Sequence, residues 1–123
     1  MQTPVDPTKT EAWLKLAELH DAFVPDLRGA FASDPGRAAK YSLTAGDLFV
    51  DLSKNLIDAA VVNALLELAD QVGVAAHRDA MFAGERINVT EDRSVLHTAL
   101  RRPKGDVLEV DGVDHAAARV GAA

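Results

Sequence analysis

The spacing of hydrophobic positions predicts a mostly helical chain with one small β-hairpin. Between Lys9 and Phe23, apolar residues recur at intervals of three and four, which is typical of an amphipathic helix. Thr8 and Glu11 have the spacing of a capping box at its start. A short helix is expected near Leu27 to Ala32, and Asp34 is placed to cap another short one.

The middle of the chain predicts a hairpin followed by a long helix. Two β-prone runs, Tyr41 to Thr44 and Leu48 to Leu52, flank a turn over residues 45–47. Asp58 is placed to cap a helix that ends at Val72. Because its apolar face is wide, we expect this helix to be well buried. That face consists of Val61, Leu65, Leu68 and Val72, flanked by Val62, Leu66 and Ala69.

Glycines divide the C-terminal half into shorter elements, with Gly73 where the residue after a helix belongs. A last helix of about six residues is too short to be stable alone in water, so we expect further chain to pack against it. The expected elements are a helix over 74–83 ending at Gly84, a turn or extended link over 85–89, a helix from Asn88 or Thr90 to about Arg101, a strand over 107–110, a turn at Asp111–Gly112 and a helix over 115–120.

Composition fits one modest domain and disfavours several classes of partner. Of the 123 residues, 48% are hydrophobic but only 5% are aromatic, which predicts an aliphatic core. The net charge of −6 disfavours nucleic acid and anionic membrane surfaces. The absence of cysteine excludes disulfides, a thiolate nucleophile and a zinc–thiolate site. Residues 1–7 are expected to form a flexible lead-in without secretory-signal features, and no apolar stretch reaches the ~18 residues of a membrane span. We therefore expect a cytoplasmic protein.

The sharpest candidate for chemistry is the series Arg93, His97 and Arg101. On one helix these residues stand at i, i+4 and i+8 and share a face. Two guanidiniums and an imidazole in a row could hold a phosphate. The alternative is structural: nearby carboxylates pair with these arginines. Those carboxylates are Glu85, Glu91 and Asp92.

Other polar residues carry weaker hypotheses. Glu85 and Glu91 could form an acid–base pair for proton transfer, although surface or ion-paired carboxylates are the favoured interpretation. The histidines have no metal-site spacing, and His20 is expected at the hydrogen-bonded edge of the core. Lys54 and Asn55 are expected to cap or orient neighbouring segments rather than bind substrate. No glycine-rich phosphate loop is present, and metal binding is not expected.

Three stretches together resemble one enzyme family. The longest is the run from Met81 to Arg101; Val50 to Asn55 lies upstream, and Val110 to Asp114 downstream. The matching positions in the long run are Met81, Phe82, Gly84, Glu85, Ile87, Asn88, Thr90, Glu91, Arg93, Val95, Leu96, His97, Ala99, Leu100 and Arg101. In order and spacing the stretches resemble the N-terminal part of the glucose-6-phosphate isomerase family, from roughly Trp13 to Asp114.

The resemblance implies a parent enzyme of glycolysis and gluconeogenesis that interconverts glucose 6-phosphate and fructose 6-phosphate through a cis-enediol, without a cofactor. It implies a cytoplasmic homodimer with an α/β fold of two doubly wound sugar-isomerase domains. Residues 8–123 would then be an N-terminal segment that ends before those catalytic domains. None of the family's catalytic glutamate, histidine or lysine positions aligns with this chain, so we expect the segment alone to be inactive. The alternative is a free-standing helical binding or interaction module derived from an isomerase, which cooperative unfolding of the isolated chain would support.

Overall fold

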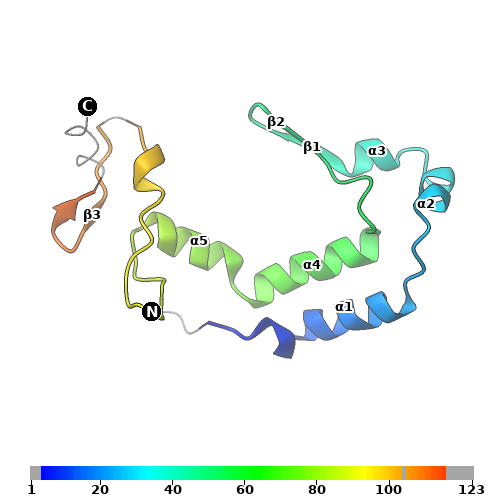
Figure 1. Ribbon diagram of the computed structural model, residues 1–123, viewed down its shortest axis with the longest axis horizontal. Helices are drawn as coiled ribbons and strands as arrows, with labels where there is room; N and C mark the ends of the chain where they lie inside the picture. Colours follow the sequence, from blue (N-terminus) through cyan, green and yellow to red (C-terminus); the bar gives the residue numbers. More distant parts are fainter. Residues whose placement is uncertain (1–3, 104, 116–123) are drawn as a thin grey trace. The chain divides into compact units, whose positions relative to one another are not determined.

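The structure is a computed structural model that describes residues 4–103 and 105–115 (Figure 1). The chain divides into two compact units. One unit is Pro7–Leu68, and among the described residues the other combines residues 4–6 with residues 69–103 and 105–115. Across the described residues the fold is mostly helical, as the sequence predicted, with two small antiparallel hairpins where the sequence predicted one.

The first unit begins with four helical elements, of which two start at side-chain caps, whereas α3 starts at Gly36 without one, so the cap expected at Asp34 is wrong. Thr10 is the N-cap of α1, because its Oγ1 accepts a hydrogen bond from the Trp13 amide at 3.2 Å. The cap predicted at Thr8 was therefore two residues early. Asp26 caps α2 through the Gly29 amide at 2.8 Å. The elements are η1 (Pro7–Lys9), α1 (Glu11–Ala22), α2 (Leu27–Ser33) and α3 (Arg37–Lys40).

The predicted hairpin is present as β1 (Ser42–Ala45) and β2 (Leu48–Asp51). The strands are antiparallel, with Leu43 opposite Val50, and Gly46 turns the chain with a φ of 59°. Leu48 and Phe49 remain 63% and 66% exposed. The hairpin thus presents apolar side chains to its surroundings.

The long helix α4 (Ala59–Gln71) starts and ends where the sequence predicted. The Val61 amide donates to Asp58 Oδ1 at 2.9 Å, and Gly73 follows the helix with a left-handed φ of 72°. Its apolar face is less buried than expected, since Leu65 and Leu66 are 46% and 61% exposed. A wide apolar face needs neighbours on more than one side, and among the described residues of α4 only Ala64 is fully covered.

The second unit is built on α5 (Val74–Phe82), which ends at Gly84 as predicted. Gly84 is buried with a φ of 76°, and a side chain there would overlap Val110. The predicted strand and turn appear as the hairpin β3 (Glu109–Val110) and β4 (Val113–Asp114). Asp111 and Gly112 both have positive φ, as a tight hairpin turn requires.

The helix predicted from Asn88 or Thr90 to Arg101 is wrong. Asn88 instead pairs with Arg93 through two backbone hydrogen bonds of 3.1 and 3.2 Å, and Asp92 has a φ of 48°. The Asn88 side chain accepts from the Glu91 amide at 3.2 Å, so a local turn competes successfully with the helix. Only the single turn η2 (Ala99–Arg101) is helical. The helix predicted over 115–120 lies, apart from His115, outside the described residues.

Most of the buried apolar side chains are alanines. Among the described residues, the buried apolar ones are Ala12 and Ala64 in the first unit, with Ala99 and Leu108 in the second. Three polar residues, Thr10, Arg37 and Ser53, are equally buried. No single helix of the described chain is long and apolar enough to cross a membrane, although α4 and α5 taken as a bent pair would pass on length and composition alone.

Candidate functional site

A buried arginine holds the loop that follows β2. Arg37, the first residue of α3, is only 5% exposed. Its Nε donates to the Ser53 carbonyl at 2.8 Å, and its Nη2 donates to two further carbonyls, of Asn55 and Ile57, at 2.9 Å each. A guanidinium can satisfy several acceptors at once because its donors are fixed in a planar fork. Arg37 therefore sets the path of the chain from β2 to α4.

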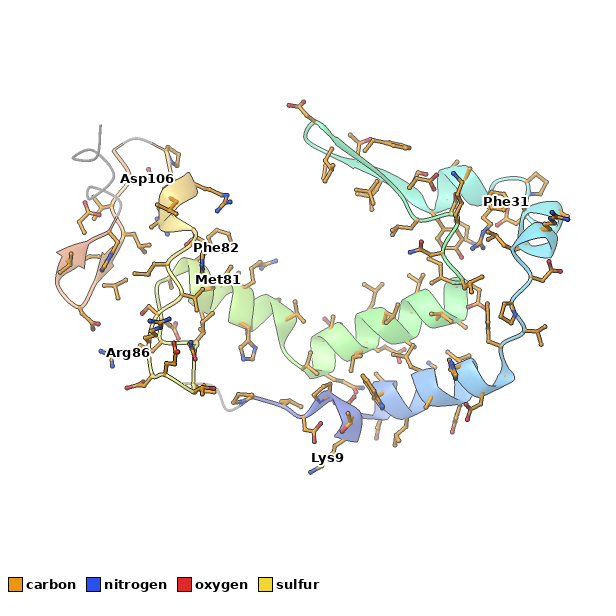
Figure 2. All side chains as sticks on the ribbon, in the orientation of Figure 1. Lys9, Phe31, Met81, Phe82, Arg86 and Asp106 are labelled. Carbon is orange, nitrogen blue, oxygen red and sulfur yellow. The ribbon has the colours of Figure 1, made fainter. Side chains whose placement is uncertain are left out.

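Aromatic rings complete the surroundings of this guanidinium. The Arg37 Cζ lies 4.8 Å from the centroid of the Tyr41 ring and 5.6 Å from that of Phe31, which is labelled in Figure 2. Such cation–π contacts favour a charge held away from water. Sequence reasoning did not find Arg37, because its carbonyl acceptors lie 16 to 20 residues further along the chain and no local pattern marks them.

Hydrogen bonds also order the start of the same loop. Ser53 is 1% exposed, and its amide donates to Asp51 Oδ1 at 2.8 Å. Hydrogen bonds from the Ser53 hydroxyl and then from its amide hold the pKa of Asp51 below the usual value. Asn55 takes part through its carbonyl rather than through the side chain that the sequence suggested. These groups stabilise the loop conformation.

A second arginine connects the Gly84–Arg93 stretch with the β3–β4 turn. Arg86, labelled in Figure 2, lies with its Nη1 3.1 Å from Asp92 Oδ2 and its Nη2 3.1 Å from Asp111 Oδ2. The hydrogen bond and charge of Asp111, followed by those of Asp92, raise the pKa of Arg86. Nearby, Ser94 Oγ donates to the Gly84 carbonyl at 2.6 Å. This segment is therefore ordered by side chains rather than by a helix.

The three predicted phosphate candidates do not share a helix face. Arg93 lies in the backbone bridge with Asn88, and its Nε contacts Glu91 Oε2 at 2.7 Å, which is the ion pairing offered as the alternative. Arg101 ends η2 and donates to the His97 carbonyl at 3.4 Å. Arg93 and Arg101 line different cavities, of about 210 and 470 Å³. The geometric argument for one phosphate site across all three residues is therefore wrong.

The largest cavity in the second unit, of about 550 Å³, lies between α5 and residues 85–89. His77 lines it, with its Nδ1 3.0 Å from the Gly73 carbonyl, and Asp79 lines it while paired with Arg78 at 2.7 Å. Glu85 lines this cavity too, whereas Glu91 is paired with Arg93 and does not line it. The two glutamates suggested as an acid–base pair thus do not share this cavity.

The histidines do not assemble a metal site in the part of the chain that the structure describes, where no group of three or more metal-ligating side chains occurs. The side chain of His20 is 88% exposed and lies 3.3 Å from Asp21. Its expected place at the edge of the core is therefore wrong.

Comparison with known proteins gives consistent matches. A family model described as phosphoglucose isomerase matches residues 51–122. The chain is 50% identical to the glucose-6-phosphate isomerase of Mycolicibacterium vanbaalenii over 89% of its own length and 20% of that protein. It is 59% identical to glucose-6-phosphate isomerase 1 of Streptomyces coelicolor over 72% of its own length and 16% of that protein. It is 52% identical to the glucose-6-phosphate isomerase of Corynebacterium efficiens over 91% of its own length and 21% of that protein.

The chain thus spans about a fifth of the length of these curated relatives. The matched family region includes the loop held by Arg37, the Arg86 ion pairs and the β3–β4 hairpin. Because this region covers more than half of the sequence, the chain belongs to the phosphoglucose isomerase family.

Proposed function

We propose that this chain is part of a glucose-6-phosphate isomerase and supplies framework rather than reacting groups. The observation that carries the proposal is the 50% identity to an enzyme of that name over 89% of the chain. The substrates would be glucose 6-phosphate and fructose 6-phosphate. The complete enzyme would be a cytoplasmic homodimer with sugar-isomerase domains, as the family resemblance implies.

The chemistry of the reaction supports a framework role. Conversion of an aldose into a ketose moves a proton between two neighbouring carbons, which needs a base within hydrogen-bond reach of the substrate. Three carboxylates of the region that matches the family model are held in ion pairs with arginines. Glu91 pairs with Arg93, while Asp92 and Asp111 both pair with Arg86. We therefore expect no isomerase activity from the 123-residue chain by itself.

The most direct test replaces the matching segment of the Mycolicibacterium vanbaalenii isomerase with this chain. Turnover of fructose 6-phosphate is followed by coupling the glucose 6-phosphate produced to its dehydrogenase. We expect the chimera to keep activity close to that of the parent enzyme, and the isolated chain to show none above the blank. A folded, dimeric but inactive chimera, or turnover by the isolated chain, would contradict the proposal.

A free-standing binding module is the competing function, and cooperative unfolding of the isolated chain separates the two. Leu65 and Leu66 of α4 are 46% and 61% exposed, as expected for a segment that packs against further protein. Thermal unfolding of the isolated chain followed by circular dichroism tests this point. A broad transition agrees with a framework segment, whereas one sharp, cooperative transition would favour the module.

A further inference from the structure

A cavity of about 470 Å³ lies in the second unit beside the turn of η2. Phe82 and Asp106, both labelled in Figure 2, belong to its wall. Its lining residues are Phe82, Thr98, Arg101, Arg102, Pro103 and Asp106. The cavity thus combines two guanidiniums and a hydroxyl with one carboxylate, in a chain whose net charge is −6.

The two arginines have different roles in this wall. Arg102 donates from Nη2 to the Phe82 carbonyl at 2.7 Å and from Nη1 to the Val107 carbonyl at 3.5 Å, so its positive charge is fixed in place. Arg101 is exposed, and within the described residues its guanidinium makes a single long hydrogen bond, of 3.4 Å, to the His97 carbonyl. Arg101 therefore keeps donors with which to contact a ligand.

Thr98 gives an independent indication of a ligand. Its hydroxyl oxygen is buried and has no hydrogen-bond partner among the described residues. It does not cap η2, because no side-chain hydrogen bond reaches the start of that turn. A buried polar atom without a partner is costly, and most buried polar atoms in folded proteins have one. Thr98 also lines the cavity, and a ligand oxygen that reached this hydroxyl by a small movement of the wall would supply that partner.

We propose that this cavity binds a compact oxyanion, the phosphate group of a phosphomonoester or free phosphate. Phosphate oxygens accept hydrogen bonds, as the Thr98 hydroxyl and the Arg101 guanidinium require, and the fixed charge of Arg102 attracts the anion. The carboxylate of Asp106 opposes the anion without cancelling both positive charges. This site does not depend on the isomerase activity proposed above, since no reacting group is assigned to it.

The test is a titration of the full 123-residue chain with inorganic phosphate, followed by ³¹P NMR in chloride buffer. We expect saturable binding. Arg101→Gln should weaken it about tenfold, because a charged hydrogen bond is lost. Thr98→Val should weaken it about threefold as one neutral hydrogen bond is removed. Arg93→Gln, which removes the same charge outside this cavity, is the matched control and should leave binding unchanged.

Two further variants sharpen the result. Asp106→Asn should strengthen binding because it removes the opposing charge, and Arg101→Lys should restore only part of the affinity because the planar fork is lost. A titration with glucose 6-phosphate separates the two sources of phosphate: tighter binding of the ester identifies a phosphomonoester site, and equal binding a site for free phosphate. Absence of saturable binding by the unmodified chain, or equal losses in Arg101→Gln and Arg93→Gln with unchanged circular dichroism, would overturn the proposal.

Discussion

Replacing Arg37 with methionine should destabilise the first unit more than any other single arginine substitution there. Methionine keeps the apolar stem but removes all three hydrogen bonds to the carbonyls of Ser53, Asn55 and Ile57. A hydrogen bond to a charged group contributes about 1.5–3 kcal/mol, and an acceptor left buried costs about 1–3 kcal/mol. Relief from burying the guanidinium offsets part of this loss. We expect a net loss of about 3 kcal/mol.

Urea unfolding measures this effect, with the fluorescence of Trp13 as a probe, because Trp13 is the single tryptophan of the chain and lies in the first unit. Arg28→Met is the matched control, since Arg28 is exposed on α2 and should change the free energy of unfolding by less than about 0.5 kcal/mol. Arg37→Lys keeps the charge without the planar fork and should fall between the two. If Arg37→Met unfolds at the same urea concentration as Arg28→Met, the loop does not depend on this residue.

The remaining predictions concern the second unit and the β2 loop. Gly84→Ala should lower the free energy of unfolding in urea by about 2–4 kcal/mol, because the new methyl group would overlap Val110 at a positive φ. Gly105 also has a positive φ but open space around it, so Gly105→Ala should lower the same free energy by about 1 kcal/mol. Equal losses in the two variants would exclude the overlap with Val110 as the cause. Arg86→Gln should slightly lower the midpoint temperature of thermal unfolding at low salt but not at 1 M salt, where exposed ion pairs are screened. A decrease in this temperature that does not depend on salt would contradict a role for the ion pairs. The pKa of the Asp51 carboxyl is lower in the folded state than in the unfolded state. The ionised carboxyl therefore stabilises the folded state at pH values above its unfolded pKa, and this stabilisation is lost as the pH falls through its folded pKa. Stability should therefore drop below about pH 4 more steeply in the unmodified chain than in Asp51→Asn, and parallel pH profiles would refute this.

Local chemistry explains what the sequence could predict. Asp58 at the start of α4, Gly73 and Gly84 after helices, and the Asp111–Gly112 turn each act through neighbours a few residues away. For the same reason the hairpin β1–β2 was found within one residue at either end of each strand. Elements defined by caps and turns are therefore accessible from one sequence.

The wrong predictions involve contacts that hydrophobic periodicity does not show. The helix expected before Arg101 fails because the Asn88 side chain and the positive φ of Asp92 close a turn that periodicity does not show. The phosphate series built on that helix failed with it, although the pairing of Arg93 with Glu91 was anticipated from their closeness in sequence. Arg101 was already a phosphate candidate, but its proposed partner Thr98 was not anticipated, because the buried hydroxyl is visible only in three dimensions.

Arg37 and Arg86 both order a loop segment, Arg37 as a buried residue and Arg86 as an exposed one. Each holds a segment without regular secondary structure, residues 53–57 and 84–94, by binding groups far away in sequence. The buried arginine binds neutral carbonyls and aromatic rings, whereas the exposed one binds two carboxylates and is therefore sensitive to salt. An arginine committed in this way has fewer hydrogen-bond donors left for a ligand. In the described chain the Arg101 guanidinium, with its single long hydrogen bond, is free of that commitment, and this is the physical reason to look for a bound anion beside η2.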